Sequence, residues 1–169
     1  SFTSRLNMNL REQKGWAYGA RSSLSSAKGP GLFSMSTSVQ TDKTAEAIRE
    51  ALKEARDLLK TRPPSAAEIK MAIDTLVLTL PGQNETIGGI ANSIAEILTF
   101  GLKDDYWNDY VSEVRALDAQ TLQAAARRLL DPDALTWIVV GDLSKIEAEV
   151  RQLGFADVKV IDPDGRIIS

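Results

Sequence analysis

The stretch that decides the fold is residues 4–20, SRLNMNLREQKGWAYGA. Its first part predicts a short helix, because Leu6 and Leu10 lie one helical turn apart and the last turn is basic. Gly15 stands where a left-handed residue would end this helix. Residues 16–26 then have the pattern of a strand. The stretch therefore predicts a helix that turns into a strand at a glycine.

A second strand follows the glycine-proline turn at residues 28–31. Between Phe33 and Val39, apolar or β-branched side chains alternate with serines, which is the two-residue period of a strand. We expect a hairpin with one wet or sparsely packed face.

Five segments with helical spacing follow the hairpin. Ser65, with a glutamate three residues later, predicts a capping box at the start of the second helix, and the proline-glycine pair at 81–82 predicts its end. Gly88 and Gly89 weaken the start of the third helix by roughly 1 kcal/mol each, so we expect close packing or a bend there. The expected helices are 42–62, 65–80, 87–100, 106–114 and 118–129.

The run 135–140 is almost continuously apolar, which predicts a strand in the middle of a sheet. A last helix through 146–153 and a short strand at 158–161 complete the chain. This order predicts an α+β fold in which helices are layered on one face of a mainly antiparallel sheet. A length of 169 residues predicts a single domain, residues 1–169.

The composition excludes several functional classes. The 20 basic and 23 acidic residues are spread along the chain, so no basic stripe is present for nucleic acid. No apolar run approaches the roughly 18 residues that a membrane-spanning helix needs. With no His and no Cys, the chain lacks an imidazole base, a thiolate nucleophile and the usual zinc ligands. We therefore expect no cofactor in this chain, no nucleic-acid partner and no membrane span.

Residues 4–20 resemble the signature at the start of the carboxy-terminal half-domains of the pitrilysin/insulinase zinc peptidases, the inverzincins. In that signature, written SRL...LRE.KG.AY, an Arg and a Tyr stand seven residues apart, and Arg11 and Tyr18 match the pair. The order of hairpin, helical block, apolar strand at 137–142, helix and strand also follows the family. The family's half-domain has a further strand and a glycine-rich stretch before Ser1, so the resemblance implies an N-terminally truncated half-domain, a C-terminal fragment of a longer peptidase chain or subunit.

The resemblance implies a clamshell of two halves. One half holds zinc in an H-x-x-E-H motif, and the other, similar in fold but without metal, closes over the peptide substrate. This chain has no His, so it resembles the zinc-less half. By the same resemblance, Arg11 and Tyr18 bind substrate, the chain has no catalytic or metal-binding residue of its own, and zinc lies in a partner half-domain or subunit. Tyr18 would donate a hydrogen bond to an oxyanion or carbonyl, and Arg11 to substrate carbonyls.

Other residues of the same stretch have simpler interpretations. Arg5, Asn7 and Asn9 are interpreted as surface or capping groups of the short helix, and Trp16 as a packing residue. Tyr106, Trp107 and Tyr110 are interpreted as a core aromatic cluster, Asp104-Asp105 as a helix cap, and Asp162-Pro163-Asp164 as a turn.

The sequence thus predicts the substrate-binding, non-catalytic half of a zinc metallopeptidase, inactive alone. The alternative is a scaffold or assembly domain on the same fold, as in core subunits of respiratory complexes. A third alternative is a self-sufficient hydrolase that uses carboxylates, but the sequence does not single out any one Asp/Glu pair as catalytic. The residues give no localisation, and family analogy favours the bacterial periplasm or cell envelope.

Overall fold

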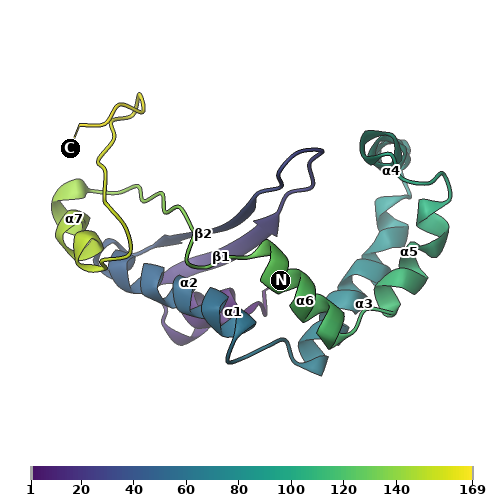
Figure 1. Ribbon diagram of the computed structural model, residues 1–169, viewed down its shortest axis with the longest axis horizontal. Helices are drawn as coiled ribbons and strands as arrows, with labels where there is room; N and C mark the ends of the chain where they lie inside the picture. Colours follow the sequence, from purple (N-terminus) through teal and green to yellow (C-terminus); the bar gives the residue numbers. More distant parts are fainter. Residues whose placement is uncertain (1, 169) are drawn as a thin grey trace. The chain divides into compact units, whose positions relative to one another are not determined.

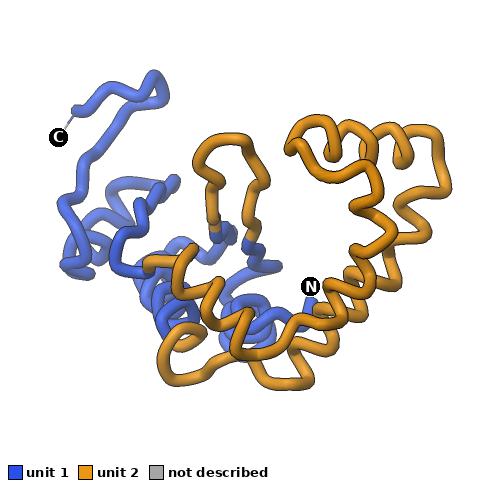
Figure 2. The backbone as a smooth tube through the Cα atoms, turned by 45° about the vertical axis from the view of Figure 1, so that its right-hand side comes forward, with its two compact units in different colours: residues 1–22, 35–56, 132–169 blue, residues 23–34, 57–131 orange. Residues whose placement is uncertain are grey.

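The structure is a computed structural model that describes residues 2–168. The chain divides into two compact units, which are described separately (Figure 2). Unit 1 contains residues 1–22, 35–56 and 132–169, and unit 2 contains residues 23–34 and 57–131. The prediction of a single domain belonging to a longer peptidase chain or subunit stays a prediction.

Unit 1 is built around the hairpin. Strands β1 (Ala17–Leu24) and β2 (Phe33–Val39) form a two-stranded antiparallel sheet, as the alternating pattern predicted. Helix α2 (Thr44–Leu59) runs beside the two strands (Figure 1). The other elements are the short helix α1 (Arg5–Asn7), the π-helix η1 (Met8–Gln13), the 3-10 helix η2 (Thr41–Lys43) and the helix α7 (Leu143–Gln152).

The core of unit 1 joins the first helices, the hairpin and α2. Leu10 is fully buried at its centre. This arrangement explains why residues 4–20 decide the fold, since their apolar side chains supply much of the core. The buried members are Leu6, Leu10, Ala20, Ala47 and Ala51, and the partly buried residues packed against them are Trp16, Ala17, Met35, Val39 and Trp137.

Unit 2 is mainly helical and contains α3 (Ala66–Gln83), α4 (Ile87–Phe100), α5 (Tyr106–Arg115) and α6 (Ala119–Leu129). The predicted capping box is present, because the Ser65 hydroxyl accepts from the Glu68 N–H and the Glu68 carboxylate accepts from the Ser65 N–H. Gly101 ends α4 in the left-handed conformation, with φ +63°. Asp105 precedes α5 without forming the side-chain cap that we expected there.

The predicted end of α3 is wrong by three residues. Pro81 lies inside its last turn, and the helix continues to Gln83. A proline removes one backbone donor, but its fixed φ is compatible with a helix. Asn84 satisfies the helix end, because its backbone N–H donates to the Pro81 carbonyl and its side-chain amide donates to the Leu80 carbonyl.

The two C-terminal strands were also predicted incorrectly. Residues 135–140 have no regular secondary structure, and Ile138 and Val140 are 83% and 94% exposed. Residues 158–161 contribute only one isolated bridge, between Ile161 and Ile167. The physical reason is that a strand requires a hydrogen-bonded neighbour, and the described sheet contains only β1 and β2. The α+β class itself is confirmed. No helix of the described chain is long and apolar enough to cross a membrane.

Candidate functional site

Arg11 lies in η1, a π-helical segment. The backbone of this segment is wider than an α-helix, as the bond from the Lys14 N–H to the Asn9 carbonyl, five residues back, shows (3.0 Å). Such segments are rare and occur frequently at functional sites. Gly15, with φ +66°, ends the helix and lets the chain turn into β1, as predicted.

The turn at Gly15 places Arg11 beside two aromatic rings. The guanidinium carbon of Arg11 lies 5.5 Å from the centre of the Tyr18 ring and 4.1 Å from the centre of the Phe2 ring. Both distances are within the range of cation–π attraction, about 6 Å. The structure therefore brings the two predicted site residues together and adds Phe2, which the sequence did not indicate.

Both members of the predicted pair are accessible. Tyr18 is 92% exposed, so its hydroxyl is open to solvent, and the Arg11 side chain is 27% exposed. Glu12 forms an ion pair with Arg11 through Nε, at 3.3 Å, and it is the one ion-pair partner of Arg11 among the described residues. The two Nη groups of the guanidinium can therefore donate hydrogen bonds to a ligand.

The interpretation of Asn7 and Asn9 as surface or capping groups is wrong. They are 4% and 7% exposed, and their side-chain amides hydrogen-bond to other elements of unit 1. Asn9 donates to Glu50 at 2.8 Å and to Glu54 at 2.9 Å, which ties η1 to α2. Both polar groups of the Asn7 side chain are hydrogen-bonded, whereas the side-chain oxygen of Asn9 is buried without a partner among the described residues.

Glu50 is one of the two carboxylates that accept from Asn9. The hydrogen bond from Asn9 lowers the pKa of the Glu50 carboxyl below its ordinary value of 4.5. Lys14, whose ammonium lies 3.4 Å from Glu50, lowers it further, while partial burial opposes both effects. The carboxylate is therefore ionised at neutral pH and helps to fix the helix that carries Arg11.

A cavity of about 340 Å³ lies elsewhere in unit 1. Its walls are mostly apolar and come from Ile48 of α2, from most of residues 135–139, from α7 and from most of residues 153–161. Arg11 and Tyr18 are not among the lining residues. The cavity therefore does not form a common site with the pair.

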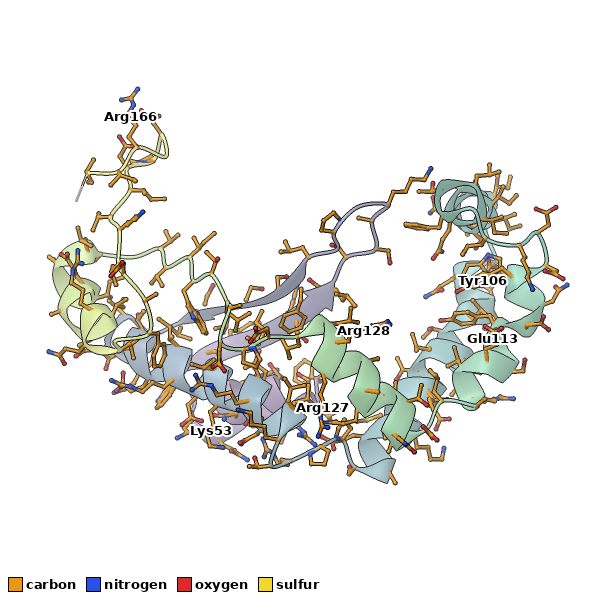
Figure 3. The ribbon with its side chains drawn as sticks, viewed as in Figure 1. Lys53, Tyr106, Glu113, Arg127, Arg128 and Arg166 are labelled. Carbon is orange, nitrogen blue, oxygen red and sulfur yellow. The ribbon has the colours of Figure 1, made fainter. Side chains whose placement is uncertain are left out.

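The predicted aromatic cluster of unit 2 is present, but its rings are half-buried and not part of the core. The rings of Tyr106 and Tyr110 each lie 5.0 Å from the Trp107 ring, measured between centroids. Burial, together with the nearby carboxylates Glu96 and Glu113, raises the pKa of Tyr106. Tyr106 and Glu113 both lie along α5 (Figure 3). The three half-buried rings pack against one another.

Two further interpretations can be compared with the structure. Trp16 packs against the core of unit 1, as expected. The side chain of Asp162 accepts from the backbone N–H groups of Asp164 and Arg166, so the predicted turn is present. Within residues 2–168, no group of three or more acidic, His or Cys side chains is placed to hold a metal ion.

The comparisons with known proteins bear on the first half of the chain most directly. Residues 1–76 match the family model of the peptidase M16 inactive domain. The chain is also similar to the crystal structure of a peptidase M16 inactive domain from Pseudomonas fluorescens, with a TM-score of 0.71 and 19% identity. That similarity covers 78% of this chain and 31% of the solved one, so the chain spans about a third of that protein's length. No curated protein matches the chain.

The fold is α+β, and the family model and the solved structure that match the chain are both peptidase M16 inactive domains. The match to the peptidase M16 inactive-domain family covers residues 1–76, and the similarity of the remaining chain lies in the fold. The resemblance predicted from residues 4–20 is confirmed by the match to this family model. The roles of Arg11 and Tyr18 stay predictions.

Proposed function

We propose that this chain is the substrate-binding, non-catalytic half of a zinc metallopeptidase, in which Arg11 and Tyr18 contact the peptide near the bond to be cleaved. The observation that supports the proposal is the geometry of the pair. Arg11 and Tyr18 come from a helix and a strand, lie 5.5 Å apart between guanidinium and ring centre, and are both accessible. An M16 inactive domain also implies a catalytic partner half.

The residue types suit a peptide ligand. A peptide presents carbonyl oxygens at regular intervals, and the guanidinium of Arg11 offers permanently charged donors to them. The Tyr18 hydroxyl can donate to a neighbouring carbonyl or to the negative charge that develops on the attacked one. Zinc, bound by the partner half, supplies the activation of water. This chain positions the peptide and contributes neutral and cationic hydrogen-bond donors.

The test uses the complete assembly with its zinc-bearing half. We expect Arg11→Ala and Tyr18→Phe each to lower kcat/KM for peptide cleavage by about 10²- to 10³-fold, the usual effect of losing one donor to the reacting group. Arg49→Ala is the matched control, because Arg49 is an exposed arginine of α2 in the same unit. Cleavage at the parent rate by both site variants would contradict the proposal.

One observation favours the alternative, a scaffold domain. Helix α4 has no buried residue, and its apolar side chains Ile87, Ile94 and Leu98 are 88%, 52% and 74% exposed. Exposed apolar side chains gathered on one element are typical of a surface that binds another protein. An assembly that forms stably without cleaving peptides would support this alternative.

A further inference from the structure

Asn7 is a buried residue that contacts two segments near Arg11. It lies where α1 passes into η1, and it is 4% exposed. Its side-chain oxygen accepts from the backbone N–H of Ala20 in β1, at 3.0 Å. Its side-chain nitrogen donates to the backbone carbonyl of Phe2, at 2.6 Å. Both hydrogen-bonding groups of this one side chain are therefore used, and they hold two separate segments.

These two segments carry the two rings beside Arg11. The ring of Phe2 lies 4.1 Å from the guanidinium carbon, and Phe2 is the residue whose carbonyl Asn7 holds. Tyr18 lies two residues before Ala20 in the same strand, so the bond to Ala20 fixes the strand close to Tyr18. One amide thus contacts the backbone of both segments that carry the aromatic neighbours of the guanidinium.

We propose that Asn7 is a positioning residue, which holds Phe2 and β1 on two sides of Arg11 and so fixes the direction of the guanidinium. The consequence for peptide binding rests on the function proposed above. The positioning itself does not, because it concerns only contacts within this chain.

The chemistry of the position requires an amide. One neighbour is an N–H donor and the other is a carbonyl acceptor, so the side chain must both accept and donate. A carboxylate in the same place keeps the bond to Ala20 but turns a second oxygen toward the Phe2 carbonyl.

The first test measures the geometry in the full-length protein, selectively labelled at arginine. The Nε–Hε resonance of Arg11 reports on the ring current of Phe2, and Phe2→Ala supplies the reference for its loss. We expect Asn7→Asp to move this resonance toward the Phe2→Ala position. It should move little further in the double variant, because Asn7 acts through Phe2.

Asn9→Ala is the matched control. Asn9 is also a buried asparagine of the same helical segment with two hydrogen bonds, but its bonds lead to α2 and not to the neighbours of Arg11. We expect this variant to lose stability while the Arg11 resonance stays at its parent position. An unchanged Arg11 resonance in Asn7→Asp, or an equal shift in Asn9→Ala, would overturn the positioning role.

The second test measures peptide cleavage by the complete assembly. Displacement of a positioned group by about 1 Å can lower a rate by about 100-fold, so we expect Asn7→Asp to lower kcat/KM by up to that factor, mainly through KM. If the resonance moves but neither Asn7→Asp nor Arg11→Ala slows cleavage, the positioning of Arg11 is supported and the proposed substrate role is wrong. The two tests therefore distinguish a failure of the positioning role of Asn7 from a failure of the proposed substrate role of Arg11.

Discussion

Glu50 links the stability of the Arg11 helix to pH. Its carboxylate accepts a hydrogen bond from Asn9 of η1 and pairs with Lys14 at the end of the same segment. Both contacts stabilise the ionised form, so the pKa of Glu50 in the folded chain lies below its ordinary value of 4.5. A carboxyl with a lowered folded pKa stabilises the protein above its unfolded pKa, and this stabilisation is lost as the pH falls through the folded value.

We therefore expect the free energy of unfolding of Glu50→Gln to depend less on pH in the acidic range than that of the parent. At neutral pH the variant should be less stable than the parent, and the difference should shrink as the pH falls below 4.5. Urea unfolding at a series of pH values between 7 and 3 measures this directly. Glu149→Gln, at an exposed position of α7, is the control and should follow the parent. Parallel curves for parent and Glu50→Gln would contradict the prediction.

The sequence identified Arg11 and Tyr18 as the residues of the candidate site, but it did not identify the buried asparagines beneath them. Arg11 and Tyr18 were identifiable because they match a family signature, and Gly15 because a helix that turns into a strand needs a left-handed residue. Asn7 and Asn9 were placed on the surface because asparagine is usually exposed. Their burial depends on the π-helical spacing of η1 and on contacts with Ala20, Glu50 and Glu54, which are far along the chain and leave no local pattern.

At the scale of elements, Gly88 and Gly89 show how neighbouring glycines differ. A Cβ at Gly89 would overlap the backbone carbonyl oxygen of Gln83, whereas the atom nearest to a Cβ at Gly88 is 3.9 Å away. The close packing that the sequence predicted is therefore present at Gly89 and absent at Gly88.

This difference gives opposite expectations for two similar variants. Gly88→Ala should stabilise α4 by up to about 1 kcal/mol, because alanine favours the helix and has room. Gly89→Ala should destabilise the protein, because backbone must move to relieve the overlap with Gln83. Thermal unfolding of the two variants measures both effects. A stabilising Gly89→Ala would show that the turn before α4 adapts at no cost.

Helices were easier to predict than strands for a physical reason. A helix satisfies its hydrogen bonds within one segment, so the spacing of apolar residues and caps such as Ser65 and Asp118 locates it. The hairpin was also predicted, because its partner strand is adjacent in sequence. Residues 135–140 have the composition of a strand, but pairing depends on a remote neighbour that their own sequence does not specify.

At the scale of the whole molecule, composition decides what chemistry the chain can perform. A zinc peptidase needs ligands that bind the metal, and His and Cys, the usual nitrogen and sulfur ligands, are both absent. The described residues contain no acidic cluster placed to replace them. The match of residues 1–76 to a peptidase M16 inactive-domain model is consistent with this lack of ligands.

We accordingly expect the isolated chain to cleave no peptide, with or without added zinc, and its thermal unfolding to be unchanged by a chelator. Adding the zinc-bearing half should produce cleavage that the chelator abolishes and that zinc restores, because the proposed function places the metal in the other half. Cleavage assays on the chain alone, on the partner alone and on the mixture distinguish the contributions. Chelator-resistant cleavage by the isolated chain would instead require a pair of carboxylates acting without metal, and it would contradict the division of labour between the two halves.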